Sequence, residues 1–169
     1  MRSPRSILAL LAALAVGVAL GTSGILPKGG EDSADGTGRV LRVVDGDTIQ
    51  VRIGEVRERV RYIGVDTPET HKPGTPVQCY GRAASARNAR LVDGERVRLE
   101  TDAESRDRYG RLLAYVYRVR DGRFINADLV RGGFAEPLTI PPNVRHAETF
   151  ADLAGEARRH GRGLWRACR

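Results

Sequence analysis

The chain is poor in several residue types, and each shortage narrows what it can be. Only two cysteines occur in 169 residues, which excludes a disulfide-rich miniprotein and a zinc site built from four cysteines. Aromatic residues make up only 5% of the chain, and lysine occurs only twice, at positions 28 and 72. The net charge of +7 therefore comes mainly from arginine, whose planar fork suits phosphate. A phosphate-bearing partner is consistent with this composition, although many basic surfaces are simply solvated.

Charged residues are also missing from positions 6–26, after Arg2 and Arg5. Residues 7–20 contain only Ile, Leu, Ala, Val and Gly. A basic start followed by an apolar run is typical of a secretory signal, and about 20 apolar residues also suffice for a membrane anchor. A buried helix is the third interpretation, but the run has no amphipathic pattern. We expect residues 1–26 to be a signal peptide or membrane anchor, so that the rest is secreted or tethered to the outer face of the cytoplasmic membrane.

Residues 27–37 are glycine, acidic and small polar residues with few apolar ones, which predicts a flexible linker. Residues 38–169 are then one domain, long enough to bury a core, and we expect it to be monomeric. Five segments have the composition or alternation of strands. They are Val40–Val44, Thr48–Ile53, Val56–Val65, Val97–Glu100 and Leu112–Val119.

Three helices are expected between and after these strands. The first covers about 80–93 and stops at Gly94, and the second covers about 126–130. The last begins near Asn143 as N-cap and buries Val144, Ala147, Ala151 and Ala154. The predicted fold class is α+β, mainly β: a five-stranded OB-fold barrel decorated with about three helices. An open mixed sheet is the alternative.

Two turns concentrate acidic residues where strands end: Asp45-Gly46-Asp47-Thr48 and Asp66-Thr67-Pro68-Glu69. Taken singly, the first is an ordinary hairpin turn and the second a strand exit. Taken together, they supply three carboxylates, from Asp47, Asp66 and Glu69, and a backbone carbonyl from Thr67. Hard cations bind such oxygens, whereas zinc prefers the sulfur and nitrogen ligands that this set lacks. The pattern therefore favours calcium, provided that the fold brings the two turns together.

Two arginines flank these turns and give the acidic set a possible use. Arg61 precedes the second turn, and Arg111 begins a strand after Asp107-Arg108-Tyr109-Gly110. Phosphodiester hydrolysis builds negative charge on phosphate oxygens, which a metal ion and guanidinium groups stabilise. Most arginines in so basic a chain are surface charges, so this interpretation depends on the whole set.

The chain resembles the staphylococcal nuclease, or thermonuclease, family from about Gly38 to Trp165. The matching motifs agree in order and spacing. They lie at 44–48, 61–70, 80–81, 84–85, 107–117, 126–133 and 163–165. The resemblance implies an OB-fold barrel with three helices and calcium-dependent hydrolysis of DNA and RNA that leaves 3′-phosphate ends.

The resemblance also implies roles for individual residues. Asp47 and Asp66 are expected to be direct calcium ligands, with Thr67 binding through its carbonyl. Glu69 is expected to orient or deprotonate the attacking water, and Arg61 and Arg111 to clamp the phosphate. Arg108 and Tyr109 are expected to contact the neighbouring nucleotide phosphate, and Asp45 to support the metal ligands from behind.

The chain departs from the family at two places that matter here. Residues 136–141 contain no aromatic residue where the family prototype has a base-stacking tyrosine, so affinity for a nucleotide is expected to be weaker. Cys79 and Cys168 have no counterpart in the prototype. In an exported protein they could pair as a disulfide, and two unpaired thiols are the alternative.

Two other functions compete with the nuclease. A nucleic-acid-binding barrel without activity is one, but such a domain would be expected to lack part of the set Asp47, Asp66, Glu69, Arg61 and Arg111. A basic envelope protein with structural calcium is the other, and it gives the two arginines no purpose.

Overall fold

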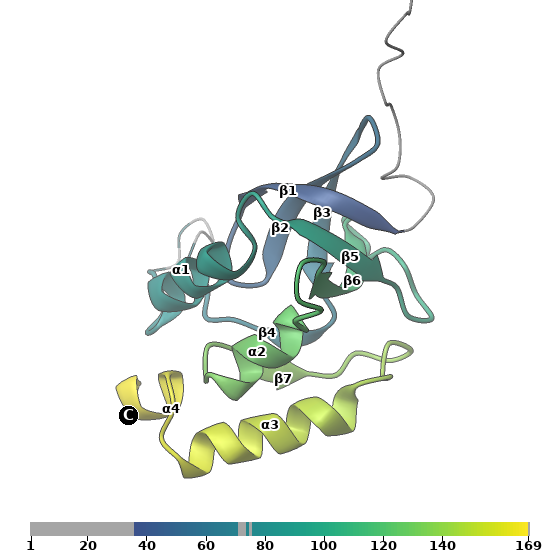
Figure 1. Ribbon diagram of the computed structural model, residues 1–169. Coiled ribbons are helices and arrows are strands. Elements are labelled where there is room, and N and C mark those ends of the chain that lie inside the picture. The colour runs from purple at the N-terminus through teal and green to yellow at the C-terminus, as the bar shows by residue number, and fades with distance from the viewer. Residues whose placement is uncertain (1–35, 71–73, 75, 169) are drawn as a thin grey trace, which may run out of the picture.

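A computed structural model describes residues 36–70, 74 and 76–168 of the chain. Its centre is a closed barrel of five strands, in the order β1-β2-β3-β6-β5 (Figure 1). The strands are β1 (Thr37–Val43), β2 (Thr48–Ile53), β3 (Val56–Tyr62), β5 (Arg96–Glu100) and β6 (Leu112–Arg118). All neighbours are antiparallel except β3 and β6, which are parallel. The predicted fold class is therefore confirmed, and the alternative of an open sheet is wrong.

Alternation of apolar and polar residues explains why these segments form a barrel. On β2, Ile49 and Val51 are fully buried, whereas Arg52, the residue after Val51, is exposed. On β3, Val60 and Tyr62 face inward in the same way. Because successive side chains of a strand point to opposite faces, this pattern fixes which face of each strand closes the core.

In the part of the chain that the structure describes, four helices and a small second sheet lie against the barrel (Figure 1). The helices are α1 (Gly81–Val92), α2 (Ile125–Arg131), α3 (Ala147–Arg159) and α4 (Leu164–Ala167). The second sheet pairs β4 (Gly64–Asp66) with β7 (Glu136–Leu138) in antiparallel register. Phe150 of α3 and Leu129 of α2 are buried in the common core.

The structure corrects sequence predictions at β4, at β1 and in the number of helices. The single strand expected at 56–65 is interrupted at Ile63, and Gly64, the first residue of β4, adopts a positive φ of 77°. A Cβ at position 64 would lie 2.4 Å from Cε2 of Phe150, so glycine also admits the close approach of α3. The expected count of about three helices omitted the short α4, and β1 begins at Thr37, one residue before the expected boundary.

The start of the last helix was also predicted wrongly. The helix begins at Ala147 after His146, and Asn143 is not its N-cap. Instead the buried Asn143 side chain accepts from the Glu104 N–H and donates to the Glu104 carbonyl. Of the expected apolar stripe, only Ala154 is buried, and Val144 is 48% exposed.

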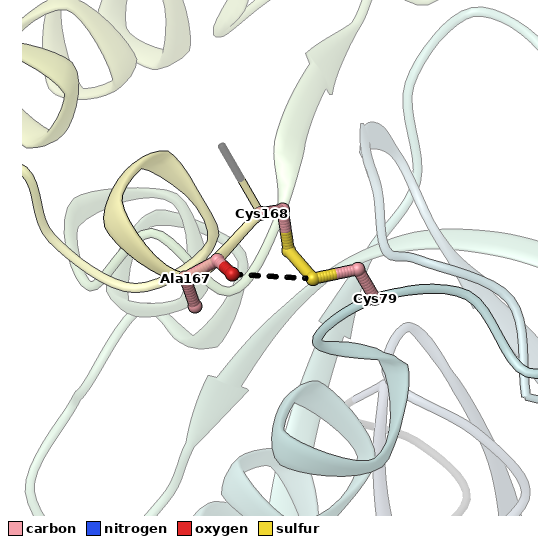
Figure 2. Close-up of a disulfide and its surroundings, with 3 residues drawn as sticks. All are labelled: Cys79, Ala167 and Cys168. Carbon is pink, nitrogen blue, oxygen red and sulfur yellow. Dashed lines mark hydrogen bonds between the residues drawn. A yellow bond between two sulfur atoms is a disulfide. The ribbon is translucent and has the colours of Figure 1, made fainter.

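Cys79 and Cys168 form a disulfide, with 5.8 Å between their Cα atoms (Figure 2). Sγ of Cys79 also lies 3.6 Å from the carbonyl oxygen of Ala167. The bond joins the segment before α1 to the end of α4 across 89 positions of sequence. Within the described part of the chain, no helix is long and apolar enough to span a bilayer, and the expected leader at 1–26 lies outside that part.

Candidate active site

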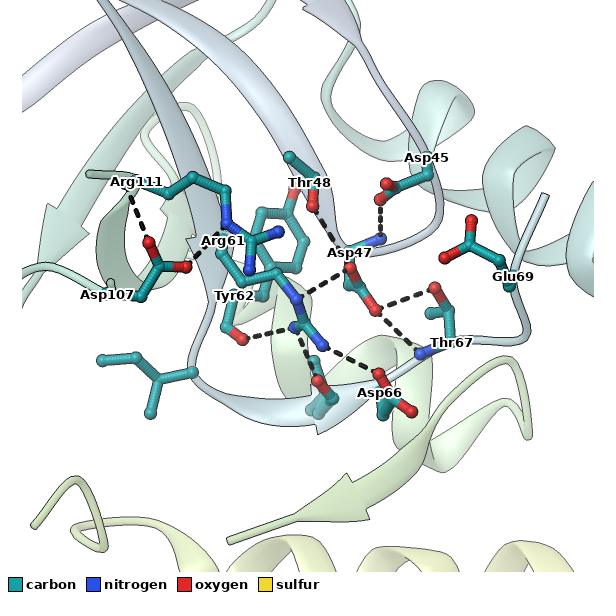
Figure 3. A network of polar contacts seen from close by, with 12 residues as sticks. Asp45, Asp47, Thr48, Arg61, Tyr62, Asp66, Thr67, Glu69, Asp107 and Arg111 are labelled. Carbon is teal, nitrogen blue, oxygen red and sulfur yellow. Dashed lines mark hydrogen bonds and ion pairs between the residues drawn. The ribbon is translucent and has the colours of Figure 1, made fainter. Parts of the chain in front are cut away.

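The two acidic turns meet through the side chain of Asp47. Both the N–H and the hydroxyl of Thr67 donate to Oδ2 of Asp47, at 2.8 Å each (Figure 3). Gly46 makes this approach possible, because a Cβ there would lie 2.5 Å from Oγ1 of Thr67. The convergence that a metal site requires is therefore built into the loops after β1 and β4.

Asp45 supports the first turn from behind. Its Oδ1 accepts the N–H of Asp47 at 3.1 Å, and its carbonyl accepts the side-chain amide of Asn88 on α1. Asn88 is fully buried and also accepts the hydroxyl of Tyr62 at 2.9 Å. Burial raises the pKa of the Asp45 carboxyl to about 6, and the nearby Asp47 carboxylate adds to this effect.

Arg61 lies between the carboxylates of Asp47 and Asp66 (Figure 3). Its Nε lies 3.2 Å from Oδ1 of Asp47, and its Nη2 donates to Oδ1 of Asp66 at 2.8 Å. Its Nη1 donates to the carbonyls of Tyr62 and Val65. These bonds hold the guanidinium at the wall of the site and partly neutralise the two carboxylates.

Asp66 remains in a negative environment despite its bond to Arg61. Partial burial raises its pKa, Arg61 opposes this, and the carboxylates of Asp47, Glu136 and Glu69 raise it further. Negative charge is therefore in excess on this side of the site.

Glu69 follows the second turn, and its backbone is fixed from both sides. Its N–H donates to Oε1 of Gln78 at 2.7 Å, and its carbonyl accepts the N–H of Gln78 at 2.9 Å. Its own Oε1 accepts the N–H of Thr70 at 2.9 Å. The carboxylate points from this loop toward Asp45 and Asp47 (Figure 3).

Arg111 approaches the same site from the start of β6. Its Nε donates to Oδ2 of Asp107 at 2.7 Å, and its backbone N–H donates to the other oxygen of that carboxylate. These bonds lower the pKa of Asp107 against the opposing effect of its burial. Neither terminal nitrogen of Arg111 has a hydrogen-bond partner among the described residues. The arginine is thus oriented through Nε, with its two-nitrogen fork available for an anion.

One cavity of about 210 Å³ collects the predicted residues. Its lining consists of Asp45, Asp47, Thr48, Arg61, Asp66, Thr67, Pro68, Glu69 and Arg111. Arg108 and Tyr109 lie outside it, in an adjoining pocket of about 570 Å³ that shares Arg61 and Arg111. The guanidinium of Arg108 lies 4.8 Å from the ring of Tyr109, which is 68% exposed.

Two residues of the site were missed in the sequence. Asn88 ties the first acidic turn to α1, and one asparagine among several polar residues of a helix gave only a weak signal. Asp107 orients Arg111. Its position four residues before that arginine is a spacing at which an ion pair can form, so the sequence did contain a signal. Both act by positioning a predicted residue, so their roles depend on contacts that only the fold provides.

The lining of the cavity suits a hard cation. It contains four carboxylates, two guanidiniums and no histidine or cysteine, so negative charge is in excess and every donor is oxygen. In the described part of the chain, no three Asp, Glu, His or Cys side chains are already gathered as a metal cluster. A site of two carboxylates and one carbonyl leaves room for water among the six to eight oxygens that calcium typically binds.

Comparison with known proteins gives a consistent result. The family model described as "Staphylococcal nuclease homologue" matches residues 59–167. A protein named thermonuclease from Staphylococcus intermedius is 46% identical over 126 residues, which cover 75% of this chain and 74% of that protein. The thermonuclease of Staphylococcus hyicus is 41% identical over 129 residues, covering 76% and 75% of the two chains.

A further relative is named as an endonuclease. Endonuclease YncB of Bacillus subtilis is 42% identical over 126 residues, which cover 73% of this chain and 59% of that protein. The family model's match at 59–167 contains the second acidic turn and the two arginines of the cavity. The chain therefore belongs to the staphylococcal nuclease family, and it is a nuclease, an enzyme that hydrolyses phosphodiester bonds.

Proposed function

We propose that the chain is a calcium-dependent endonuclease that cleaves DNA and RNA and leaves 3′-phosphate ends. The observation that carries this proposal is the shared lining of one cavity by Glu69, Arg61 and Arg111 with two acidic turns. A module that only binds nucleic acid would have no use for a carboxylate held beside a phosphate-binding arginine. The names of the relatives, thermonuclease and endonuclease, support the same reaction.

Asp47, Asp66 and the Thr67 carbonyl would hold the calcium ion. Their oxygen donors and the excess of negative charge in the cavity are what this ion requires. When bound, calcium supplies charge that stabilises the phosphate oxygens as the reaction proceeds. The bond from Asp45 to the Asp47 N–H fixes the turn that presents the first ligand.

Glu69 acts on the nucleophile. Its carboxylate accepts a proton from a water molecule while the water oxygen forms a bond to phosphorus. The bond from phosphorus to the 5′ oxygen breaks, and that oxygen leaves with a proton from solvent as a 5′-hydroxyl. The phosphate stays on the 3′ oxygen. The two bonds from the Glu69 backbone to Gln78 fix this part of the loop, and the Thr70 N–H holds the carboxylate through Oε1.

Arg111 binds the phosphate that is attacked. Asp107 holds its Nε and leaves the terminal nitrogens as a fork for two phosphate oxygens. Arg61 adds a second positive charge beside the same cavity. Arg108 and Tyr109, in the adjoining pocket, contact the next phosphate and its nucleotide.

The test is cleavage of a labelled single-stranded oligonucleotide by the purified protein. We expect cleavage with calcium, loss of cleavage with a chelator, and recovery when calcium is added back. Products treated with a phosphatase should lose a 3′-phosphate. Full activity in chelator would overturn the calcium requirement, and products with 5′-phosphate ends would overturn the direction of bond cleavage.

We further propose that residues 1–26 direct export and that the domain acts outside the cytoplasmic membrane. The disulfide between Cys79 and Cys168 supports this, because such bonds persist mainly in oxidising compartments. Cell fractionation with antibody detection tests it, and a protein found only in the cytoplasmic fraction would overturn it.

A further inference from the structure

Five exposed arginines form two rows across the outer face of β1, β2 and β3. One row contains Arg39, Arg52 and Arg57, which lie opposite one another in register, and the other places Arg42 and Arg59 on either side of Gln50. We call these five residues the arginine track. The residues that alternate with them, such as Val51 and Val60, are buried in the core.

A bulge at Leu41 brings both arginines of β1 onto this face. The register shifts between Val40 and Arg42, so that Leu41 is the extra residue of β1. In an uninterrupted strand, residues 39 and 42 would point to opposite sides, because side chains alternate. The extra residue restores Arg42 to the outer face, opposite Gln50, to which its Nε donates at 3.1 Å.

The charges of the track are not balanced by the residues that the structure describes. Among the described residues, none of the five arginines forms an ion pair. The one acidic residue on β1, β2 and β3 is Glu58, which is bonded to Arg106 at 2.7 and 3.0 Å. Like charges directly opposite each other destabilise a sheet. A row of three arginines in register therefore costs stability and indicates an anionic partner outside the chain.

The track leads into the active site along β3. Arg57 and Arg59 point to the same face of β3, and Arg61 of the catalytic cavity is the next residue on that face. Every second residue of a strand lies about 7 Å further along it, so these three arginines are evenly spaced. Arg57 and Arg59 also line a hollow of about 460 Å³ together with Tyr109 and Arg111. Because Arg111 lines the catalytic cavity as well, the two spaces adjoin.

We propose that the arginine track binds the sugar–phosphate backbone of a single nucleic-acid strand beyond the nucleotide that is cut. The occupant follows from charge complementarity and from continuity with the cavity in which the phosphodiester reacts. Since arginine contacts to phosphate carry no base information, the track binds DNA and RNA of any sequence. It makes the enzyme favour long strands over dinucleotides. This inference rests on the proposed function for its substrate, but its binding test does not depend on cleavage.

Two matched triple variants test the track. The track variant carries Arg52→Gln, Arg57→Gln and Arg59→Gln. The control variant carries Arg131→Gln, Arg159→Gln and Arg166→Gln, which removes the same charge from exposed positions on α2, α3 and α4. Thermal unfolding checks both proteins. The track variant should unfold at the same temperature as wild type or higher, because like charges have been removed. A lower temperature would assign the arginines a structural role and overturn the proposal.

The first measurement is binding without cleavage. Both triple variants, in a Glu69→Gln background with chelator, are titrated with a labelled oligothymidylate of about 20 nucleotides, longer than one OB-fold covers. The track variant should bind about tenfold more weakly or worse at low salt. Its plot of log affinity against log salt should be shallower by about 2, since each phosphate contact on a single strand contributes about 0.7. The control variant should match the parent on both measures.

The second measurement is kinetic. Without the Glu69 substitution, the track variant should lose about tenfold in kcat/KM on the long strand. Its kcat/KM on a dinucleotide, which is too short to reach the track, should equal that of wild type. Equal losses for both triple variants, or equal losses on both substrates, would overturn the track while leaving the nuclease proposal intact.

The remaining outcomes separate the two proposals. Weaker oligonucleotide binding by the track variant, with no cleavage by wild type, would support the track and overturn the nuclease mechanism. Vesicles containing phosphatidylglycerol serve as a competing anionic surface. A loss of vesicle binding with unchanged oligonucleotide binding would overturn the nucleic-acid assignment.

Discussion

Asp47 and Thr67 are 20 positions apart in sequence, yet one carboxylate oxygen of Asp47 accepts both the N–H and the hydroxyl of Thr67. These two bonds join the loop after β1 to the loop after β4. Through them, an expected metal ligand also fixes the loop that carries Asp66 and Glu69. The geometry of the cavity therefore depends on the close approach of Thr67 to the first turn, which the absence of a Cβ at Gly46 permits.

Gly46→Ala should separate the two loops. The new Cβ would meet Thr67 within 2.5 Å, so the turns must move apart. We expect turnover to fall on the order of 10- to 100-fold and stability to fall by about 1–3 kcal/mol. The matched change Gly155→Ala, in the middle of α3, should leave turnover unchanged and stabilise the protein by about 0.5–1 kcal/mol. Steady-state kinetics and denaturant unfolding check both, and equal kinetics for the two variants would refute the argument.

Glu69→Gln should remove the proton acceptor without disturbing the fold. We expect kcat to fall about 100- to 10,000-fold, the usual contribution of a positioned acid or base. The melting temperature should change little, because the two bonds that the Glu69 backbone makes to Gln78 remain. Glu148→Gln, on the exposed first turn of α3, is the control and should behave as wild type. A Glu69→Gln enzyme with unreduced kcat would remove this residue from the mechanism.

The barrel could be predicted from sequence because its strands alternate, and alternation is a local property that Ile49, Val51 and Val60 display directly. The small sheet of β4 and β7 could not be predicted. Its second strand has three residues, one of them Pro137, and its pairing with Val65 and the neighbours of Val65 forms only in the folded chain.

The candidate site divides in the same way. Carboxylates in turns and arginines beside them are visible in the sequence, and the fold does bring the two turns together. Asn143 shows the limit. Asparagine is a common N-cap residue, but in the folded chain the Asn143 amide is bonded to the backbone of Glu104, 39 positions away. The bond that Arg111 donates to Asp107 was likewise not predicted, because it depends on the turn that brings the two residues together.

Reduction of the disulfide should destabilise the domain. Cys79 and Cys168 close a loop of 89 positions, and losing such a constraint on the unfolded chain costs about 2–5 kcal/mol. Urea unfolding with and without a reducing agent measures this. The double variant Cys79→Ser, Cys168→Ser should unfold like the reduced wild type and should not respond to the reducing agent. An unchanged urea midpoint on reduction would contradict the prediction.

Acid should weaken the protein partly through Asp121. Its bond to the buried Arg118 lowers the pKa of Asp121 to about 2, below the value of about 3.9 in an unfolded chain. Between these values the unfolded state binds more protons, so stability is present above pH 4 and is lost as the pH falls toward 2. Asp121→Asn should therefore lower the melting temperature at neutral pH and flatten its dependence on acid. Asp152→Asn, on the exposed face of α3, should change neither, and the same slope in both variants would refute this assignment.

The covalent bond between the segment before α1 and the last residues of α4 has a consequence for survival among proteases. Every described loop from Tyr80 to Ala167 lies inside the closed ring that Cys79 and Cys168 define. A single nick in any of these loops leaves both pieces attached, so that the carboxylates of the first half and Arg111 of the second stay on one molecule. After a single cut the two fragments therefore stay covalently linked through the disulfide until a reductant breaks it.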